Sequence, residues 1–471
     1  MNESYLECPQ CKTSYGAFPP RSKCSDCGSA LEYQYDYEAL RPVVSLKGSI
    51  SFWRYASLLP EVKAKYRISL GEGGTPVIAA KRLAKELGLV RLALKDETRN
   101  PTNSFRDRAA TLMISNAFEY GHKHVICASN GNLGASVAAY AAKAGLKCSV
   151  IVPRKVHVGK LAQMYAYNAL VTTKGDIVDD SIELAEKLAR EEDLYQATDG
   201  LNPLTIESQK TIAFEISEQI DIPDWIIAPM GSGGTVYSIW KGFRELELLA
   251  LSEKLPRVVG VQAEGCAPIV RAFERNGRIE SLSKVGTDAL AILVKQPLSG
   301  ERALEAVRES GGLATSVSDE EIRKAERLIA QSEGLFSELA SAATISCVQK
   351  LVADGTIDSQ DRVACLITAS GLKAPYVLEA LIRHPKAIGM RGKVSVKLRV
   401  LRLLELGKSY GYLIWNSLGR SVSLQAVYQH LTELEEKDLV SSKEEGKRKY
   451  YRITNRGKRV LNALEELAML F

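Results

Sequence analysis

The feature that most constrains the fold is an alternation of short apolar runs with segments of helical periodicity, between about residues 66 and 391. The runs are rich in β-branched residues and include 123–127, 148–152, 225–228, 258–261 and 363–367. Strands that are apolar along their whole length are typical of parallel sheets covered by helices on both faces. The central part of the chain is therefore predicted to be an α/β body with parallel sheets.

Two Cys-x-x-Cys knuckles precede this body. Cys8 and Cys11 form the first, and Cys24 and Cys27 form the second after twelve intervening residues. Four thiolates at this spacing can bind a tetrahedral zinc ion, and Gly28 permits the tight turn that a knuckle requires. We predict a structural zinc site, because four thiolates leave no coordination position for water. A redox role is the alternative.

The composition is that of an ordinary soluble protein, with 471 residues of which 45% are hydrophobic and 25% are charged. The sequence lacks an apolar run of about 18 residues, and residues 1–5 lack the basic and then apolar character of a secretory signal. Five of the nine cysteines are scattered among apolar residues, which favours reduced thiols. We therefore expect a cytoplasmic protein with no membrane partner.

The tail beyond residue 394 has a different pattern. Helices are predicted over 398–406, 410–418 and 423–437, the last with Ser423 as its N-cap. Two β-like runs, 439–442 and 449–453, are joined by a charged turn that contains Gly446, and a final helix begins at about residue 455. Three helices, a basic hairpin and a last helix predict a winged helix-turn-helix.

The positive charge of the chain belongs to this tail. The formal net charge is +6, yet residues 391–471 contain sixteen lysines and arginines against nine acidic residues. Residues 1–390 contain 46 basic and 47 acidic residues and are close to neutral. A basic surface attracts the phosphate backbone of nucleic acids. The distribution favours a DNA-binding tail on a nearly neutral body.

Candidate DNA contacts lie on the third helix and the hairpin of the tail. Opposite the apolar face of the helix, hydrogen-bonding side chains are predicted to reach base edges or phosphates: Ser423, Gln425, Tyr428, Gln429 and Thr432. On the hairpin, basic side chains are predicted to meet phosphates: Lys443, Lys447, Arg448, Lys449 and Arg452. A solvated basic surface and protein binding are the alternatives.

Several segments of the body match, in order, the motifs of one enzyme family. They are Gly71-Glu72-Gly73-Gly74-Thr75-Pro76, Asn100-Pro101-Thr102-Asn103-Ser104-Phe105-Arg106-Asp107-Arg108, Ala128-Ser129-Asn130-Gly131-Asn132-Leu133-Gly134 and Gly231-Ser232-Gly233-Gly234-Thr235. A glycine turn between a strand and a helix presents backbone N–H groups to an anion. Over about residues 66–373 the chain resembles threonine synthase, an enzyme that uses pyridoxal phosphate (PLP).

This resemblance implies a two-lobed, fold type II body and a set of binding residues. In the family, the loop that corresponds to Ser129, Asn130, Gly131 and Asn132 holds the substrate carboxylate, and Asn132 would face the ring hydroxyl of the cofactor. Gly231, Ser232, Gly233, Gly234 and Thr235 would cradle the cofactor phosphate, with Ser232 in place of an asparagine. Thr368 would lie near the pyridine nitrogen.

Arg106 is the departure with the largest consequence. It stands where the family motif N-P-T-x-S-F-K-D-R has the lysine that forms an imine with PLP. A guanidinium stays protonated and offers only donors, so it cannot attack an aldehyde. The resemblance therefore implies a body without catalytic residues. It would hold PLP only without a covalent bond, or would bind an effector related to an amino acid or PLP, with Arg106 pairing to a carboxylate or phosphate.

Other departures surround the same pocket, at residues 288–297, 338–341 and 368–374. Several changes around one pocket suggest that selection for turnover has been lost. Lys95 or Lys160 would have to lie in near-attack geometry to replace the missing amine, which we do not expect. A pocket retained only as a folding scaffold is the alternative to a ligand sensor.

The tail resembles winged helix-turn-helix regulators of the PadR kind. Tyr410-Gly411-Tyr412 opens one helix, residues 426–431 take the position of the recognition helix, and residues 449–457 match the Y-x-I/L-T-x-x-G signature. Such regulators read paired half-sites on double-stranded DNA, so we expect a homodimer in which the helix over 459–470 pairs.

We predict a zinc ribbon (1–35), a threonine synthase-like body (36–390) and a DNA-binding domain (391–471). Together they would form a transcription regulator with a catalytically inactive sensor body, acting on genes of amino-acid biosynthesis. Two alternatives remain. One is a working PLP-dependent lyase with an autoregulatory tail. The other is a silent partner subunit of a true threonine synthase.

Overall fold

The computed structural model describes residues 4–18, 20–42, 44, 48–374, 393–405, 407, 409–419, 422–446, 448–458 and 460–461. The chain divides into two compact units, Met1–Pro375 and Tyr376–Phe471. The predicted boundary near residue 390 and most of the predicted helix over 459–470 lie outside the described residues. Across the described residues, the helices are too short or too polar to span a bilayer.

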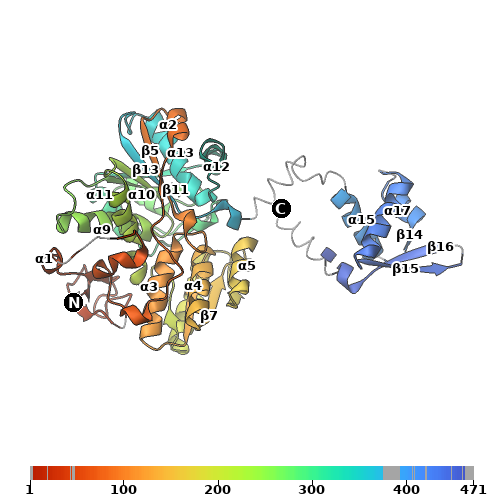
Figure 1. Cartoon of the computed structure of the whole chain (residues 1–471), viewed down its shortest axis with the longest axis horizontal. Coiled ribbons are helices and arrows are strands. Elements are labelled where there is room, and N and C mark those ends of the chain that lie inside the picture. The colour runs from red at the N-terminus through yellow and green to blue at the C-terminus, as the bar shows by residue number, and fades with distance from the viewer. Residues whose placement is uncertain are drawn as a thin grey trace. The chain divides into compact units, whose positions relative to one another are not determined.

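Two sheets of mainly parallel strands organise the first unit (Figure 1). The six-stranded sheet has the order β12 (Leu313–Val317), β11 (Arg257–Ala263), β10 (Trp225–Pro229), β13 (Arg362–Ile367), β5 (Arg91–Asp96) and β4 (Val77–Ala79). Only the pairing of β4 with β5 is antiparallel. The four-stranded sheet, all parallel, has the order β8 (Leu170–Thr173), β7 (Lys147–Val152), β6 (His124–Ala128) and β9 (Tyr195–Gln196). The predicted α/β fold with parallel sheets is confirmed.

Helices cover these sheets. They are α2 (Lys81–Glu86), α3 (Arg106–Glu119), α4 (Asn132–Ala144), α5 (Val158–Ala166), α6 (Val178–Glu191), α7 (Leu204–Gln209), α8 (Thr211–Gln219), α9 (Gly234–Leu248), α10 (Pro268–Glu274), α11 (Gly300–Glu309), α12 (Asp319–Glu333) and α13 (Leu339–Ala353). The short helix α1 (Tyr37–Leu40) belongs to the N-terminal segment, and its Tyr37 donates to Glu245 of α9. In Figure 1, α3, α4 and α5 lie beside β7 of the four-stranded sheet, whereas α2, α12 and α13 lie beside β5 and β13 of the six-stranded sheet. Small residues let α4 pack closely, since a Cβ on Gly134 would lie 2.7 Å from Val150 and Met164.

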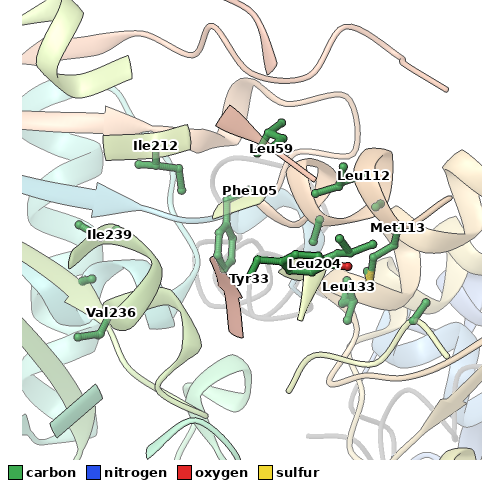
Figure 2. Close-up of a cluster of buried hydrophobic side chains, with 14 of the residues drawn as sticks. Tyr33, Leu59, Phe105, Leu112, Met113, Leu133, Leu204, Ile212, Val236 and Ile239 are labelled. Carbon is green, nitrogen blue, oxygen red and sulfur yellow. The ribbon is translucent and has the colours of Figure 1, made fainter. Parts of the chain in front are cut away.

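A large apolar core fixes the base of α3. Phe105 precedes this helix and is buried in a cluster with Tyr33, Leu204 and Ile212 (Figure 2). Tyr33 belongs to β3 (Glu32–Gln34) of the N-terminal segment, so this segment shares the core of the body. Burying aromatic side chains of this size stabilises the unit and holds the first residue of α3 in place.

The N-terminal segment forms a small antiparallel sheet, β2 (Ser14–Gly16), β1 (Tyr5–Glu7) and β3, that is tied to α9 and α11 by polar contacts. Lys241 Nζ donates to the Tyr33 carbonyl at 2.7 Å, and Glu32 accepts from Tyr237 and pairs with Arg302 at 2.9 Å. The segment therefore docks on the helix that follows the glycine loop of residues 231–235.

The second unit contains α15 (Lys393–Glu405), β14 (Ser409–Tyr410), α16 (Gly411–Ser417), α17 (Leu424–Glu436), β15 (Val440–Glu445) and β16 (Arg448–Ile453). Its sheet has the order β14-β16-β15, and its core includes Val400, Leu404, Val427, Leu431 and Tyr451. The predicted three helices and hairpin are confirmed, as is the capping of α17, where Ser423 Oγ accepts from the amide of Ala426. Tyr410 lies in β14 and not in the predicted helix, because it pairs with Tyr450.

Candidate functional site

A cavity of about 90 Å³ lies at the carboxyl ends of strands from both sheets. Ala128 ends β6, Pro229 ends β10, and Thr368 follows β13, and all three line the cavity. Loops at this edge of parallel sheets are the usual place for a ligand site in α/β proteins. Among the described residues that line the cavity there is no lysine.

The predicted anion loop, residues 231–235, forms one wall. Gly233 has a φ of 92°, and a Cβ there would lie 2.6 Å from the carbonyl oxygen of Ser299, so only glycine fits. The loop ends at the start of α9, whose first amides have no acceptor within the helix. The hydroxyl of Thr235 donates to Gln209 Oε1 at 2.8 Å. The loop can therefore present backbone donors, with the Thr235 hydroxyl already engaged.

The predicted carboxylate loop forms a second wall. Ser129 Oγ accepts from the amides of Gly131 and Gly134, both at 2.9 Å, which holds the turn into α4. Asn130 reaches the carbonyl of Leu293 at 3.4 Å. Gly131 has a φ of 122° and lies against the side chain of Lys160. The loop is thus built tightly, and Ser129, Asn130 and Asn132 line the cavity.

Glu338 links this loop to a buried lysine. Asn132 Nδ2 lies 2.9 and 3.0 Å from the two carboxylate oxygens of Glu338, while Asn132 Oδ1 is buried without a hydrogen-bond partner. Lys160 Nζ lies 3.0 Å from Glu338 Oε2. Burial opposes ionisation of Glu338, but Lys160 and Asn132 outweigh it and hold the pKa of this carboxyl below its usual value. Lys95 pairs with Glu215 at 2.7 Å, and neither Lys95 nor Lys160 is among the residues that line the cavity.

Thr368 lies in the floor of the cavity. Its hydroxyl is 2.8 Å from Ser341 Oγ, which also accepts from the amides of Thr368 and Ala369. The same segment pairs with the loop before α3, where the Phe105 amide donates to the Thr368 carbonyl at 2.9 Å. These contacts place the floor and the start of α3 side by side.

Arg106 is the first residue of α3 and lines the cavity. Its guanidinium carbon lies 4.7 Å from the centre of the Phe105 ring. Its Nη1 lies 2.8 Å from Asp199 Oδ2. Asp199 also lines the cavity and was not predicted from the sequence. The sequence does show an acidic residue in the Thr-Asp-Gly turn after β9, but its position along the chain does not indicate that it contacts Arg106.

The residues that line the cavity fit a bound anion. Backbone donors and a guanidinium suit a phosphate or carboxylate. The described lining residues include Arg106 and no lysine, and the amine of Lys160 lies 3.0 Å from the lining residue Glu338.

The four cysteines of the knuckles come together as predicted. Their Sγ atoms lie within 4.8 Å of one another, with the closest pairs, Cys8 with Cys27 and Cys11 with Cys24, at 3.4 and 3.5 Å. Gly28 has the positive φ, 75°, that the second knuckle requires. This donor set fits a tetrahedral zinc ion. The other five cysteines are buried and unpaired.

The predicted DNA-contact residues of α17, Ser423, Gln425, Tyr428, Gln429 and Thr432, are all exposed, opposite buried Val427, Leu431 and Leu434. On the hairpin, Lys443, Arg448 and Arg452 are exposed and occupy positions whose side chains share one face of the sheet. Lys449 lies on the other face and donates to Glu435 of α17 at 3.1 Å. Arg448 lies over the ring of Tyr410 at 4.6 Å. Lys447 lies outside the described residues.

Comparison with known proteins identifies both parts. Residues 68–369 match the family described as pyridoxal-phosphate dependent enzyme, and residues 400–463 match the transcriptional regulator PadR-like family. The body thus has the fold of a PLP-dependent enzyme. A fungal L-serine ammonia-lyase from Rhizomucor miehei, 21% identical, shares this fold with a TM-score of 0.58, covering 66% of this chain and 97% of the other.

The relatives narrow the class further. The threonine synthase of Methanocaldococcus jannaschii is 41% identical over 407 residues, covering 84% of this chain and 99% of the relative. That of Mycobacterium tuberculosis is 42% identical over 310 residues, covering 65% and 84%. The chain therefore belongs to the threonine synthase family of PLP-dependent enzymes, with a PadR-like domain at its C-terminal end.

Proposed function

We propose that this protein is a sequence-specific transcription regulator whose threonine synthase-like body senses a ligand without catalysing a reaction. The observation that carries the proposal is Arg106. It takes the motif position of the imine-forming lysine and lines a cavity that has no lysine among its described lining residues. A guanidinium cannot form the imine on which the family's chemistry depends.

The PadR-like domain is the proposed output. The exposed polar face of α17 and the basic face of the hairpin supply the donors that major-groove and phosphate contacts need. The body is the proposed input, and the support for this is that residues 129–132 and 231–235 form glycine turns that lead into helices at the cavity. A zinc ion held by Cys8, Cys11, Cys24 and Cys27 would stabilise the N-terminal segment against α9.

The test measures both functions on the purified full-length protein. We expect no threonine from O-phosphohomoserine in the presence of PLP, and retention of a small set of sites from fragmented genomic DNA. Threonine formation at an enzyme-like rate would overturn the sensor half of the proposal. Retained DNA without any sequence preference would overturn the proposed role as a sequence-specific regulator.

A working lyase is the second candidate, and Lys160 is the residue that favours it. Its amine lies 3.0 Å from Glu338, which lines the cavity. If Lys160 supplied the missing amine, threonine formation would be measurable and would be abolished by Lys160→Met. We expect neither, because in the structure the Lys160 ammonium is engaged by a buried carboxylate.

A further inference from the structure

The ion pair of Arg106 with Asp199 indicates which ligand the cavity selects. Resting on the proposed sensor function, we propose that the cavity binds an unmodified aliphatic L-amino acid as a zwitterion, without a cofactor. Arg106 would bind its carboxylate, and Asp199 would bind its ammonium group.

Asp199 is held in place by its neighbours. Thr198 Oγ1 accepts from the amide of Ala128 at 2.9 Å and donates to Gln196 Oε1 at 2.6 Å. On the other side, Gly200 has a φ of 79° and fits against Leu298, which a Cβ would approach to 2.8 Å. These contacts fix the backbone on both sides of Asp199, which lines the cavity, so its position does not depend on the ion pair alone.

Asp199 also changes the character of the anion loop. A Cβ on Gly234 would lie 3.6 Å from Asp199 Oδ1, so the carboxylate stands directly before the start of α9. A phosphate dianion on this loop would face that negative charge at short range, which is unfavourable in a partly buried site. A ligand with an ammonium group beside its carboxylate would instead gain an attraction from Asp199. The loop that suits phosphate in isolation thus favours a zwitterion in this chain.

Arg106 complements Asp199. The ion pair with Asp199 uses Nη1, which is one arm of the guanidinium fork. The geometry of this contact is not that of a hydrogen bond, so the N–H groups of Nη1 have no hydrogen-bond partner. A planar fork with several N–H groups can bind a carboxylate through two parallel hydrogen bonds. A zwitterion that inserts here replaces one ion pair by two, so neither charge is left unpaired.

The remaining lining defines the side chain of the ligand. Val178, Ile182, Ile292, Val294 and Leu298 line the same cavity as the ion pair. A wall of branched aliphatic side chains favours an aliphatic ligand side chain over a charged one, because a charge placed there would lose its hydration. This lining points to amino acids such as valine or isoleucine.

The test titrates the full-length protein by calorimetry with L-valine and with two analogues that each lack one charge. The 2-hydroxy acid analogue lacks the ammonium group, and L-valinamide lacks the carboxylate. We expect L-valine to bind at least about tenfold more tightly than either analogue, as loss of a charged hydrogen bond implies. Asp199→Asn should abolish discrimination against the hydroxy acid alone, and Arg106→Gln should abolish discrimination against the amide alone.

Three results would overturn the inference. These are tighter binding of PLP or inorganic phosphate than of L-valine and L-isoleucine, no binding of either amino acid, or unchanged discrimination in folded Asp199→Asn protein. Circular dichroism of both variants checks the fold. Selection of genomic sites is measured in parallel. If the protein selects specific genomic sites but binds PLP more tightly than the amino acids, the amino-acid ligand is rejected and the proposed regulator function stands. If the protein selects no specific sites, the regulator function itself is rejected.

Discussion

The strand register of the hairpin predicts that basic residues of equal charge contribute unequally to DNA affinity. Lys443 and Arg452 are exposed and occupy positions on one face of the β15–β16 hairpin. Lys449 is on the opposite face and donates to Glu435, and this hydrogen bond raises the pKa of Lys449. A lysine already paired with a carboxylate within its own domain gains less from a phosphate.

The expected change in the salt dependence of DNA binding follows from counterion release. Each phosphate contact changes the slope of log K against log salt concentration by about 0.9. The double variant Lys443→Ala/Arg452→Ala should therefore lower the slope by about 2, and Lys443→Ala alone by about 1. Lys449→Ala removes the same single charge as Lys443→Ala, and should leave the slope nearly unchanged. This pair of single variants is matched in charge, so bulk electrostatics cannot produce the difference.

Fluorescence anisotropy with a labelled duplex, measured over a series of salt concentrations, gives these slopes. Thermal unfolding of each variant separates lost contacts from lost structure. Equal slopes for Lys443→Ala and Lys449→Ala would refute the assignment of the binding face. An unchanged slope in the double variant would refute phosphate binding by the hairpin.

Three further predictions concern the body. Lys373 is buried, which lowers its pKa to about 8, so the unfolded chain binds the extra proton between about pH 8 and 10.5, and the contribution of Lys373 to the free energy of unfolding should rise with pH there by about 3 kcal/mol. In denaturant titrations the difference in the free energy of unfolding between wild type and Lys373→Met should change by this amount over that range, and a difference that does not vary with pH would exclude this contribution. Cys24→Ser should abolish stoichiometric zinc and lower the midpoint of thermal unfolding, because the N-terminal segment shares the core of the body; full zinc occupancy in this variant would contradict a four-thiolate site. Wild-type protein with PLP and O-phosphohomoserine should release no phosphate above the buffer blank, and release that tracks protein concentration would restore the enzyme interpretation.

Much of the fold could be predicted because its signals are local. The strand β10 is buried at every residue from Trp225 to Pro229, and its continuous apolar sequence predicts this burial. The capping of α17 by Ser423 also follows from adjacent residues. The cysteine cluster is local too, since its two knuckles are separated by only twelve residues.

The missed features depend on contacts between distant parts of the chain. Asp199 follows a two-residue strand and meets Arg106 only because β9 and the start of α3 converge at the cavity. The pairing of Lys449 with Glu435 depends on which face of the hairpin packs against α17. Neither periodicity nor spacing carries this information, so charge counting treated all hairpin lysines and arginines as equivalent.

We propose that the chain regulates transcription and does not synthesise threonine. The most direct test incubates the full-length protein with fragmented genomic DNA at near-physiological salt, and sequences what is retained with and without L-valine, L-isoleucine, threonine or PLP. We predict enrichment of a few palindromic upstream sites whose occupancy shifts with an aliphatic amino acid. Retention without sequence preference, or no retention, would contradict a role in transcription regulation.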